Sequence, residues 1–225
     1  MRMVKEELGA DAVIMSNKSV DGGVEIVAAR DFDEQLIQSK TLEVGASQPY
    51  ATIQSAITDS SAGDTVYVHN GAYNGGINIT NGIKLVGESK VGVVVTQDSA
   101  TTSGQGISID GVNGATISNI TFNSPAGSPI YYALKAYQSA NLTLNNLTFN
   151  GPGKNGLNAR SKKIGGVDVN SSQNVNYNNI SVNNYSKNGF SFTAKYASLD
   201  TATSNLNLSN IAANNNGWQA WHFTQ

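Results

Sequence analysis

The 225-residue sequence predicts an all-β protein, most of it a solenoid of stacked coils with three short strands in each coil. The first observation is a motif that alternates apolar and polar residues around a central Asn. Its four copies are Ile117–Phe122, Leu144–Phe149, Tyr177–Val182 and Leu208–Ala213. The central residues Asn119, Asn146, Asn179 and Asn210 are 27, 33 and 31 residues apart. The second observation is the composition, which has only 13% charged residues and 28 Asn.

Further short strands complete each expected coil. One precedes each copy of the motif, at Ile107–Ile109, Ala133–Ala136, Val167–Val169 and, weakly, Ala197–Leu199. A third follows some copies, at Phe190–Phe192 and Trp221–Phe223. A single coil is too thin to bury a core. Stacking coils about 4.8 Å apart pairs each strand with its neighbours and creates a continuous apolar interior.

The apolar residues of these strands are expected to face the interior. They are Ile107, Ile109, Ile117, Ile120, Phe122, Leu134, Leu144, Leu147, Phe149, Val167, Val169, Ile180, Val182, Phe190, Phe192, Ile211 and Phe223. The central Asn suits a corner of the coil because it tolerates left-handed backbone and bonds locally. Asn stacked on Asn in successive coils predicts an amide ladder.

Composition excludes several other classes. The chain has no Cys, so it has neither disulfides nor thiolate sites. A net charge of −2 gives no basic surface for nucleic acid. No apolar run approaches the roughly 20 residues that span a membrane. Residues 1–10 lack the apolar core of a signal peptide.

Charge is unevenly distributed and predicts a boundary near residue 40. Residues 1–40 carry 13 of the 30 charged side chains, and 27 of the 28 Asn follow from Asn70 onward. Residues 1–40 are expected to form a small α+β segment of different origin that is fused to the rest. It would contain a helix over Met1–Leu8, strands at Ala12–Met15 and Val24–Ala28, and a turn at Asp21–Gly23.

This segment resembles a known family. Glu7–Gly9, Asp11–Ile14, Ser16–Asn17 and Gly22–Ala29 are similar to the N-terminal region of the flagellar-biosynthesis GTPase of the signal-recognition-particle type. The nucleotide chemistry of that family belongs to a later domain. A phosphate loop needs G-x-x-x-x-G-K-[ST], and the nearest match, Gly153-Lys154, is followed by Asn155. GTPase activity is therefore not expected.

Residues 41–225 resemble a second family. The stretch Pro49–Ser89 and the recurring Asn motif are similar to the right-handed parallel β-helix of the pectin-lyase-like superfamily. The resemblance implies that a helix over residues 50–58 caps the N-terminal end of the solenoid. The chain stops inside a coil at Trp221–Gln225, so we expect a truncated β-helix whose last edge needs a partner or further coils.

The superfamily includes lyases, hydrolases, esterases and binding proteins, and the fold does not choose among them. Hydrolysis of a glycosidic bond needs two suitably spaced carboxylates. The acids after residue 40 are Glu43, Asp59, Asp64, Glu88, Asp98, Asp110, Asp168 and Asp200, and none forms a close pair in sequence. Asp110, Asp168 and Arg160 are the weak catalytic candidates. Lys135 and Asp168 each precede a repeating Asn by 11 residues, which predicts an exposed ion pair between adjacent coils.

The candidate binding residues are aromatic and lie close together in the sequence. Tyr131, Tyr132 and Tyr137 cluster around Lys135, and exposed aromatic rings can pack on sugars. The alternative is that these tyrosines cover a coil edge beneath a loop. His69 and His222 lie about five coils apart, so structural roles are expected and neither a metal nor a cofactor is predicted.

The sequence therefore favours a non-catalytic, secreted or cell-surface β-helix that binds polysaccharide. Two alternatives stay open. One is a polysaccharide lyase or glycoside hydrolase, and the other is a structural scaffold in a chimeric chain. Composition favours an extracellular location for the solenoid, although the chain shows no signal peptide.

Overall fold

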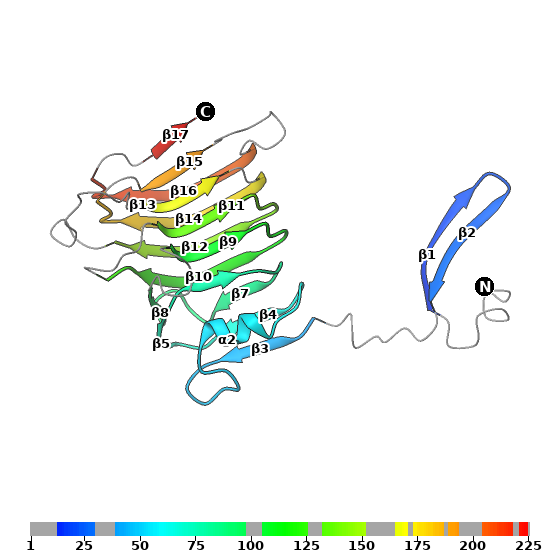
Figure 1. The fold of residues 1–225 in the computed structure, drawn as a ribbon, viewed down its shortest axis with the longest axis horizontal. Coiled ribbons are helices and arrows are strands. Elements are labelled where there is room, and N and C mark those ends of the chain that lie inside the picture. The colour runs from blue at the N-terminus through cyan, green and yellow to red at the C-terminus, as the bar shows by residue number, and fades with distance from the viewer. Residues whose placement is uncertain are drawn as a thin grey trace. The chain divides into compact units, whose positions relative to one another are not determined.

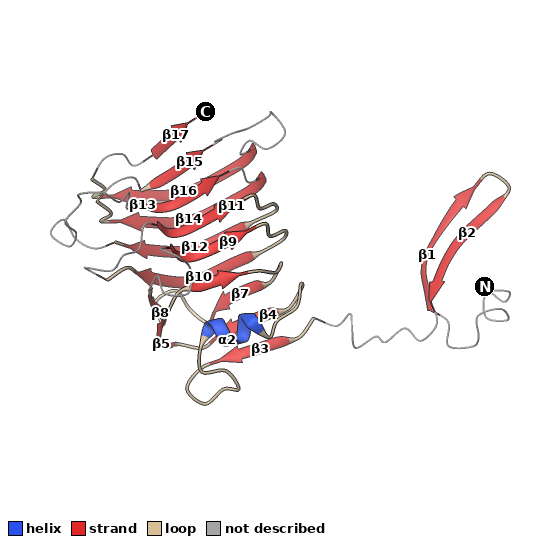
Figure 2. Ribbon diagram, viewed as in Figure 1, coloured by secondary structure: helices blue, strands red, loops and turns tan. Residues whose placement is uncertain are grey.

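A computed structural model describes residues 13–29, 39–97, 105–125, 132–151, 165–170, 173–186, 189–193, 204–217 and 221–224. The chain divides into two compact units, Met1–Gln38 and Ser39–Gln225. Figure 2 shows that strands account for most of the described residues of both units.

The first unit contains an antiparallel hairpin of β1 (Val13–Val20) and β2 (Gly23–Ala29). Its turn occupies residues 21 and 22, and Gly22 adopts a φ of 92°, which suits glycine. The predicted turn and second strand are present, and the first strand continues to Val20. The predicted helix over residues 1–8 lies outside the described residues.

The second unit is formed by short strands and one short helix (Figure 1). The elements are β3 (Thr41–Val44), α2 (Ile53–Thr58), β4 (Thr65–Val68), β5 (Gly71–Asn74), β6 (Ile77–Ile79), β7 (Lys84–Gly87), β8 (Val93–Thr96), β9 (Gln105–Asp110), β10 (Thr116–Asn123), β11 (Tyr132–Tyr137), β12 (Thr143–Asn150), β13 (Gly165–Asn170), β14 (Gln173–Asn183), β15 (Phe190–Thr193), β16 (Ser204–Asn214) and β17 (Trp221–Thr224).

Two sheets run along this unit, and the pairings between their neighbouring strands are parallel. The first has the order β16-β14-β12-β10-β7-β4-β3, with β5 and β8 continuing it beside β10. The second has the order β17-β15-β13-β11-β9-β6. Neighbouring strands belong to successive turns of the chain, which Figure 1 shows as stacked layers. This is a parallel β-helix, so the predicted fold class is confirmed.

The repeating Asn forms the corner of the coil, as predicted. In β10, Thr116–Ser118 pairs with β7 and Thr121–Asn123 pairs with β8, so the strand turns between two directions. Asn119 lies at that turn with a φ of 59°. Two strands that are separate in the earlier coils therefore become one bent strand from β10 onward.

The predicted amide ladder follows this corner. Asn146 Nδ2 donates to Asn119 Oδ1 at 2.9 Å, and Asn179 Nδ2 donates to Asn146 Oδ1 at 2.8 Å. In the last described coil the contact shifts by one residue, since Asn210 Nδ2 reaches Asn178 Oδ1 at 3.3 Å. The ladder satisfies polar groups that a corner would otherwise leave unpaired.

The core occupies the interior of the coils. Most predicted inward residues are buried, and Ile211 in the last described coil is half-buried. The side chains of Val167, Val169, Phe192 and Phe223 lie outside the described set. Phe122 and Phe149 stack with ring centroids 5.2 Å apart. Tyr177, which was not predicted to be inward, is also buried.

One strand assignment was wrong. Phe190–Thr193 pairs with β13, and Trp221–Thr224 pairs with β15, so both belong to the second sheet with Ile107–Ile109. They are not additional third strands. The strand of the second sheet that precedes the fourth Asn motif is therefore β15. The predicted strand at Ala197–Leu199 lies outside the described residues. Variable loop lengths obscured this equivalence in the sequence.

Helix α2 falls within the segment where a helix was expected. Thr52 is its N-cap, and its hydroxyl accepts from the Ser55 N–H at 3.1 Å. The helix packs on β3, β4 and β6. The Asn78 N–H donates to Gln54 Oε1 at 2.7 Å, and Gln54 Nε2 donates to the Asn78 carbonyl at 3.4 Å. Gln54 therefore hydrogen-bonds to the backbone N–H and carbonyl of Asn78 in β6, which is the terminal strand of the second sheet.

Candidate functional site

The described part of the predicted binding site lies on the outer side of the second sheet. In β11, Leu134 and Ala136 are buried, whereas Tyr132, Lys135 and Tyr137 are half-buried. This alternation directs Lys135 and Tyr137 away from the core, whereas Tyr132 at the start of the strand is half-buried outside the alternation. Asp110, at the end of β9, is exposed and lies opposite Tyr137 in the strand register. We refer to Asp110, Tyr132, Lys135 and Tyr137 as the β11 face.

The β11 face contains a cation–π contact. Lys135 Nζ lies 5.5 Å from the centroid of the Tyr137 ring. Such a contact contributes about 0.5–1 kcal/mol at an exposed site. Because Lys135 and Tyr137 are two positions apart on one strand, their side chains leave the same side of the sheet. The contact gives the face a polar group directly beside an aromatic surface.

The strand register places further polar residues beside this pair. Ser108, Lys135 and Asp168 occupy one row across β9, β11 and β13. The expected adjacency of Lys135 and Asp168 on neighbouring coils agrees with this register. The ion pair between their side chains stays a prediction, because the side chains of β13 are outside the described set.

The backbone does not bring together the two acids among the catalytic candidates. Asp110 and Asp168 lie two strands apart and are offset by two residues, with β11 between them. Strand spacing and rise put their Cα atoms about 12 Å apart. Arg160, the third candidate, and Tyr131 lie outside the described residues. The catalytic assignment therefore stays a prediction.

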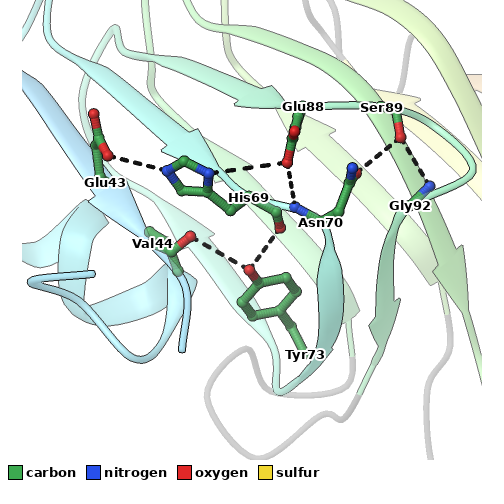
Figure 3. Close-up of polar contacts among 8 residues, drawn as sticks. All are labelled: Glu43, Val44, His69, Asn70, Tyr73, Glu88, Ser89 and Gly92. Carbon is green, nitrogen blue, oxygen red and sulfur yellow. Dashed lines mark hydrogen bonds and ion pairs between the residues drawn. The ribbon is translucent and has the colours of Figure 1, made fainter. Parts of the chain in front are cut away.

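A second polar cluster, which the sequence did not reveal, surrounds His69 (Figure 3). His69 follows β4, Glu43 is in β3, and Glu88 follows β7, so the three come from successive coils. His69 Nε2 lies 3.0 Å from Glu43 Oε2, and His69 Nδ1 lies 3.9 Å from Glu88 Oε2. We call these three residues the His69 cluster.

Backbone groups hold the His69 cluster in place. Glu88 Oε2 accepts from the Asn70 N–H at 2.7 Å. The Tyr73 hydroxyl donates to the His69 carbonyl at 2.6 Å and lies 3.3 Å from the Val44 carbonyl (Figure 3). Burial, and then the nearby Glu88 carboxylate, raise the pKa of Tyr73 above its usual value. The neutral hydroxyl therefore stays available as a donor.

The geometry of the His69 cluster suits a structural role, in which side-chain contacts link three successive coils. The two carboxylates face opposite nitrogens of the ring, so one cation cannot contact all three groups in this arrangement. Among the residues that the structure describes, no group of three His, Asp or Glu side chains could hold a metal ion.

The strand pairing defines the class: residues from Thr41 onward form a parallel β-helix protein. No protein-family model matches the chain. The N-terminal resemblance is confirmed by a match to flagellar biosynthesis protein FlhF of Pseudomonas aeruginosa, which is 38% identical over 65 residues. That match covers 28% of this chain and 15% of FlhF.

Similar solved structures are pectin methylesterases. One, a variant in complex with a hexasaccharide, is 16% identical with a TM-score of 0.44, covering 65% of this chain and 56% of that one. The carrot enzyme is 15% identical with a TM-score of 0.45, covering 76% and 62%. PemA from Erwinia chrysanthemi is 16% identical with a TM-score of 0.38, covering 65% and 55%. Since these TM-scores are low, the β-helix assignment rests on the strand pairing of this chain.

The described helices include none with the length and apolar character required to cross a membrane.

Proposed function

We propose that residues 41–225 form a non-catalytic β-helix domain that binds polysaccharide through the β11 face. The observation that carries the proposal is the contact of Lys135 with the Tyr137 ring, which lies on the outer side of a parallel sheet beside Tyr132 and Asp110. In this proposal residues 1–40 are a separate fused segment, and the β-helix acts at the cell surface or after secretion.

The chemistry of the β11 face matches that of a sugar ring. Pyranose rings present apolar C–H faces, which pack on aromatic rings while the hydroxyls stay hydrated. Tyr132 and Tyr137 supply aromatic surface. Lys135 supplies hydrogen-bond donors, and the exposed Asp110 supplies acceptors. Aromatic area flanked by polar groups of both kinds favours carbohydrate over a purely apolar ligand.

The non-catalytic part of the proposal is supported by the placement of the acids. The backbone offsets Asp110 from Asp168 by two strands and two residues. General acid–base cleavage of a glycosidic bond uses two carboxylates roughly 5–9.5 Å apart that flank the bond.

The test is a binding assay of the full chain against a panel of immobilised polysaccharides. Tyr137→Ala should weaken binding about tenfold, because one aromatic–sugar contact is worth roughly 1 kcal/mol or more. Tyr67→Ala is the matched control, since Tyr67 is also half-buried but lies on the first sheet. Equal losses in the two variants would contradict the assignment of the face.

A parallel depolymerisation assay separates binding from catalysis. The chain is incubated with each polysaccharide that it binds, with and without Ca²⁺, and new chain ends are measured. No turnover is expected. Turnover that disappears in Asp168→Ala would instead establish an enzyme. Absence of both binding and turnover would favour the scaffold.

A further inference from the structure

The charged residues around the β11 face alternate in sign. Lys135 is half-buried in β11, the exposed Asp110 lies on the preceding coil, and the register puts Asp168 opposite Lys135 on the following coil. Ser108, the residue of β9 in the same row as Lys135, is uncharged. One cation is thus flanked by two acids.

The charge of Lys135 is already engaged within the protein. Its ammonium group lies over the Tyr137 ring, whose π-electrons attract cations. Asp110 belongs to the same row as Tyr137, and Asp168 to the same row as Lys135. Strand spacing and rise put the Cα atom of Lys135 about 5 Å from that of Asp168 and about 8 Å from that of Asp110, which is within or near one Debye length at physiological salt.

A polyanion would therefore meet an unfavourable surface. A chain of uronate sugars that crosses these coils would gain from Lys135 but be repelled where it passes the exposed Asp110. Like charges brought together at an interface are strongly disfavoured. An uncharged sugar loses nothing, because its hydroxyls donate to carboxylates and accept from the ammonium group.

We infer that the ligand of the β11 face is an uncharged polysaccharide, such as a neutral hexan or pentan. This inference rests on the proposed polysaccharide-binding function. Asp110 acts in it as the residue that discriminates against acidic chains, while Tyr137 supplies the contact that neutral and acidic sugars share.

The experiment compares binding of the full chain to neutral polysaccharides, such as galactan, mannan and xylan, with binding to polygalacturonate. We expect saturable binding to at least one neutral polymer and at least tenfold weaker binding to polygalacturonate. Neutral binding should change less than twofold between about 0.05 and 0.5 M salt, because no counterions are exchanged. Preferential, salt-sensitive binding to polygalacturonate would overturn the inference and leave the proposed function standing.

A charge variant tests the discriminating residue. Asp110→Lys should raise the ratio of polygalacturonate affinity to neutral-polymer affinity about tenfold or more, since an adjacent charge reversal at an exposed site is worth roughly 1–2 kcal/mol. Asp59→Lys is the matched control, because Asp59 is also an exposed acid but directly follows α2 and is not part of the β11 face. An equal gain in both variants would show a non-specific charge effect and contradict the role of Asp110. No binding of the wild type to any polymer would refute the proposed function itself.

Discussion

Asn146 donates its side-chain amide to Asn119 and accepts from Asn179, although these partners lie 27 and 33 residues away in the sequence. All three residues have positive φ values between 54° and 59°. One residue type therefore meets two requirements, because Asn tolerates left-handed backbone and its amide has both a donor and an acceptor. The corner of the β-helix depends on this pairing.

The first prediction separates these two roles. Asn146→Ala should lower the free energy of unfolding by about 2–4 kcal/mol, because it removes two hydrogen bonds and the side-chain amide through which Asn tolerates left-handed backbone. Asn146→Gly loses the same hydrogen bonds but tolerates the φ, so its loss should be smaller by about 1 kcal/mol. Urea unfolding measures both. Equal losses would show that backbone conformation contributes nothing at this corner.

The second prediction concerns the interior stack. Phe149→Ala should destabilise the protein by about 3–5 kcal/mol, since Phe149 is fully buried against Phe122. Phe149→Leu retains most of the volume and should cost appreciably less. Thermal or chemical unfolding followed by circular dichroism provides the comparison. A cost below 1 kcal/mol for the Ala variant would be incompatible with a packed core at this position.

The third prediction concerns the His69 cluster. The Glu43 and Glu88 side chains are 46% and 41% exposed, so solvent screens their interactions with His69. Glu43→Gln should therefore change stability by less than about 1 kcal/mol. Glu88→Ala should cost more, because Glu88 also accepts from the Asn70 N–H. The reverse order in unfolding experiments would assign the main role to the His69–Glu43 contact.

The fourth prediction is an effect of alkaline pH through Tyr185. Burial strongly raises the pKa of this phenol above its ordinary value of 10.0, and a hydrogen bond with Ser124 lowers it in part. Above pH 10 the phenol ionises in the unfolded chain but stays neutral in the folded one. The stability contributed by the neutral phenol is thus present below pH 10 and is lost as the pH rises further.

The variant that tests this effect is Tyr185→Phe. At pH 7 it should be less stable than the wild type by about 0.5–1.5 kcal/mol, because the hydroxyl lies 3.4 Å from Ser124 Oγ and the contact is weak. Above pH 10 the difference should shrink or reverse. A pH-independent difference between the two unfolding free energies would contradict the assigned cause.

The sequence was sufficient for features in which residue type reports conformation directly. Asn at a fixed place in each motif predicted both the corner and the ladder, and alternation around Ile120 and Leu147 predicted the inward side. The position of β15 was not predicted, because loop lengths change between coils and conceal which strands are equivalent. The His69 cluster was not predicted either. Its partners are separated by 26 and 19 residues, and those charges belong to no repeat.

The candidate site was predictable only in part for a similar reason. The alternation of β11 placed Lys135 and Tyr137 on one side, and equal spacing from the repeating Asn placed Asp168 beside Lys135. The contact between Lys135 and the Tyr137 ring depends on side-chain rotamers, which sequence periodicity does not specify.

Hydrogen–deuterium exchange of the full chain with and without a bound polysaccharide tests the central claim most directly. The account predicts slower exchange in peptides that cover 105–110 and 132–137, and little change in peptides that cover 41–44 and 65–68 of the first sheet. Protection confined to the first sheet would contradict the assignment of the binding surface to the β11 face.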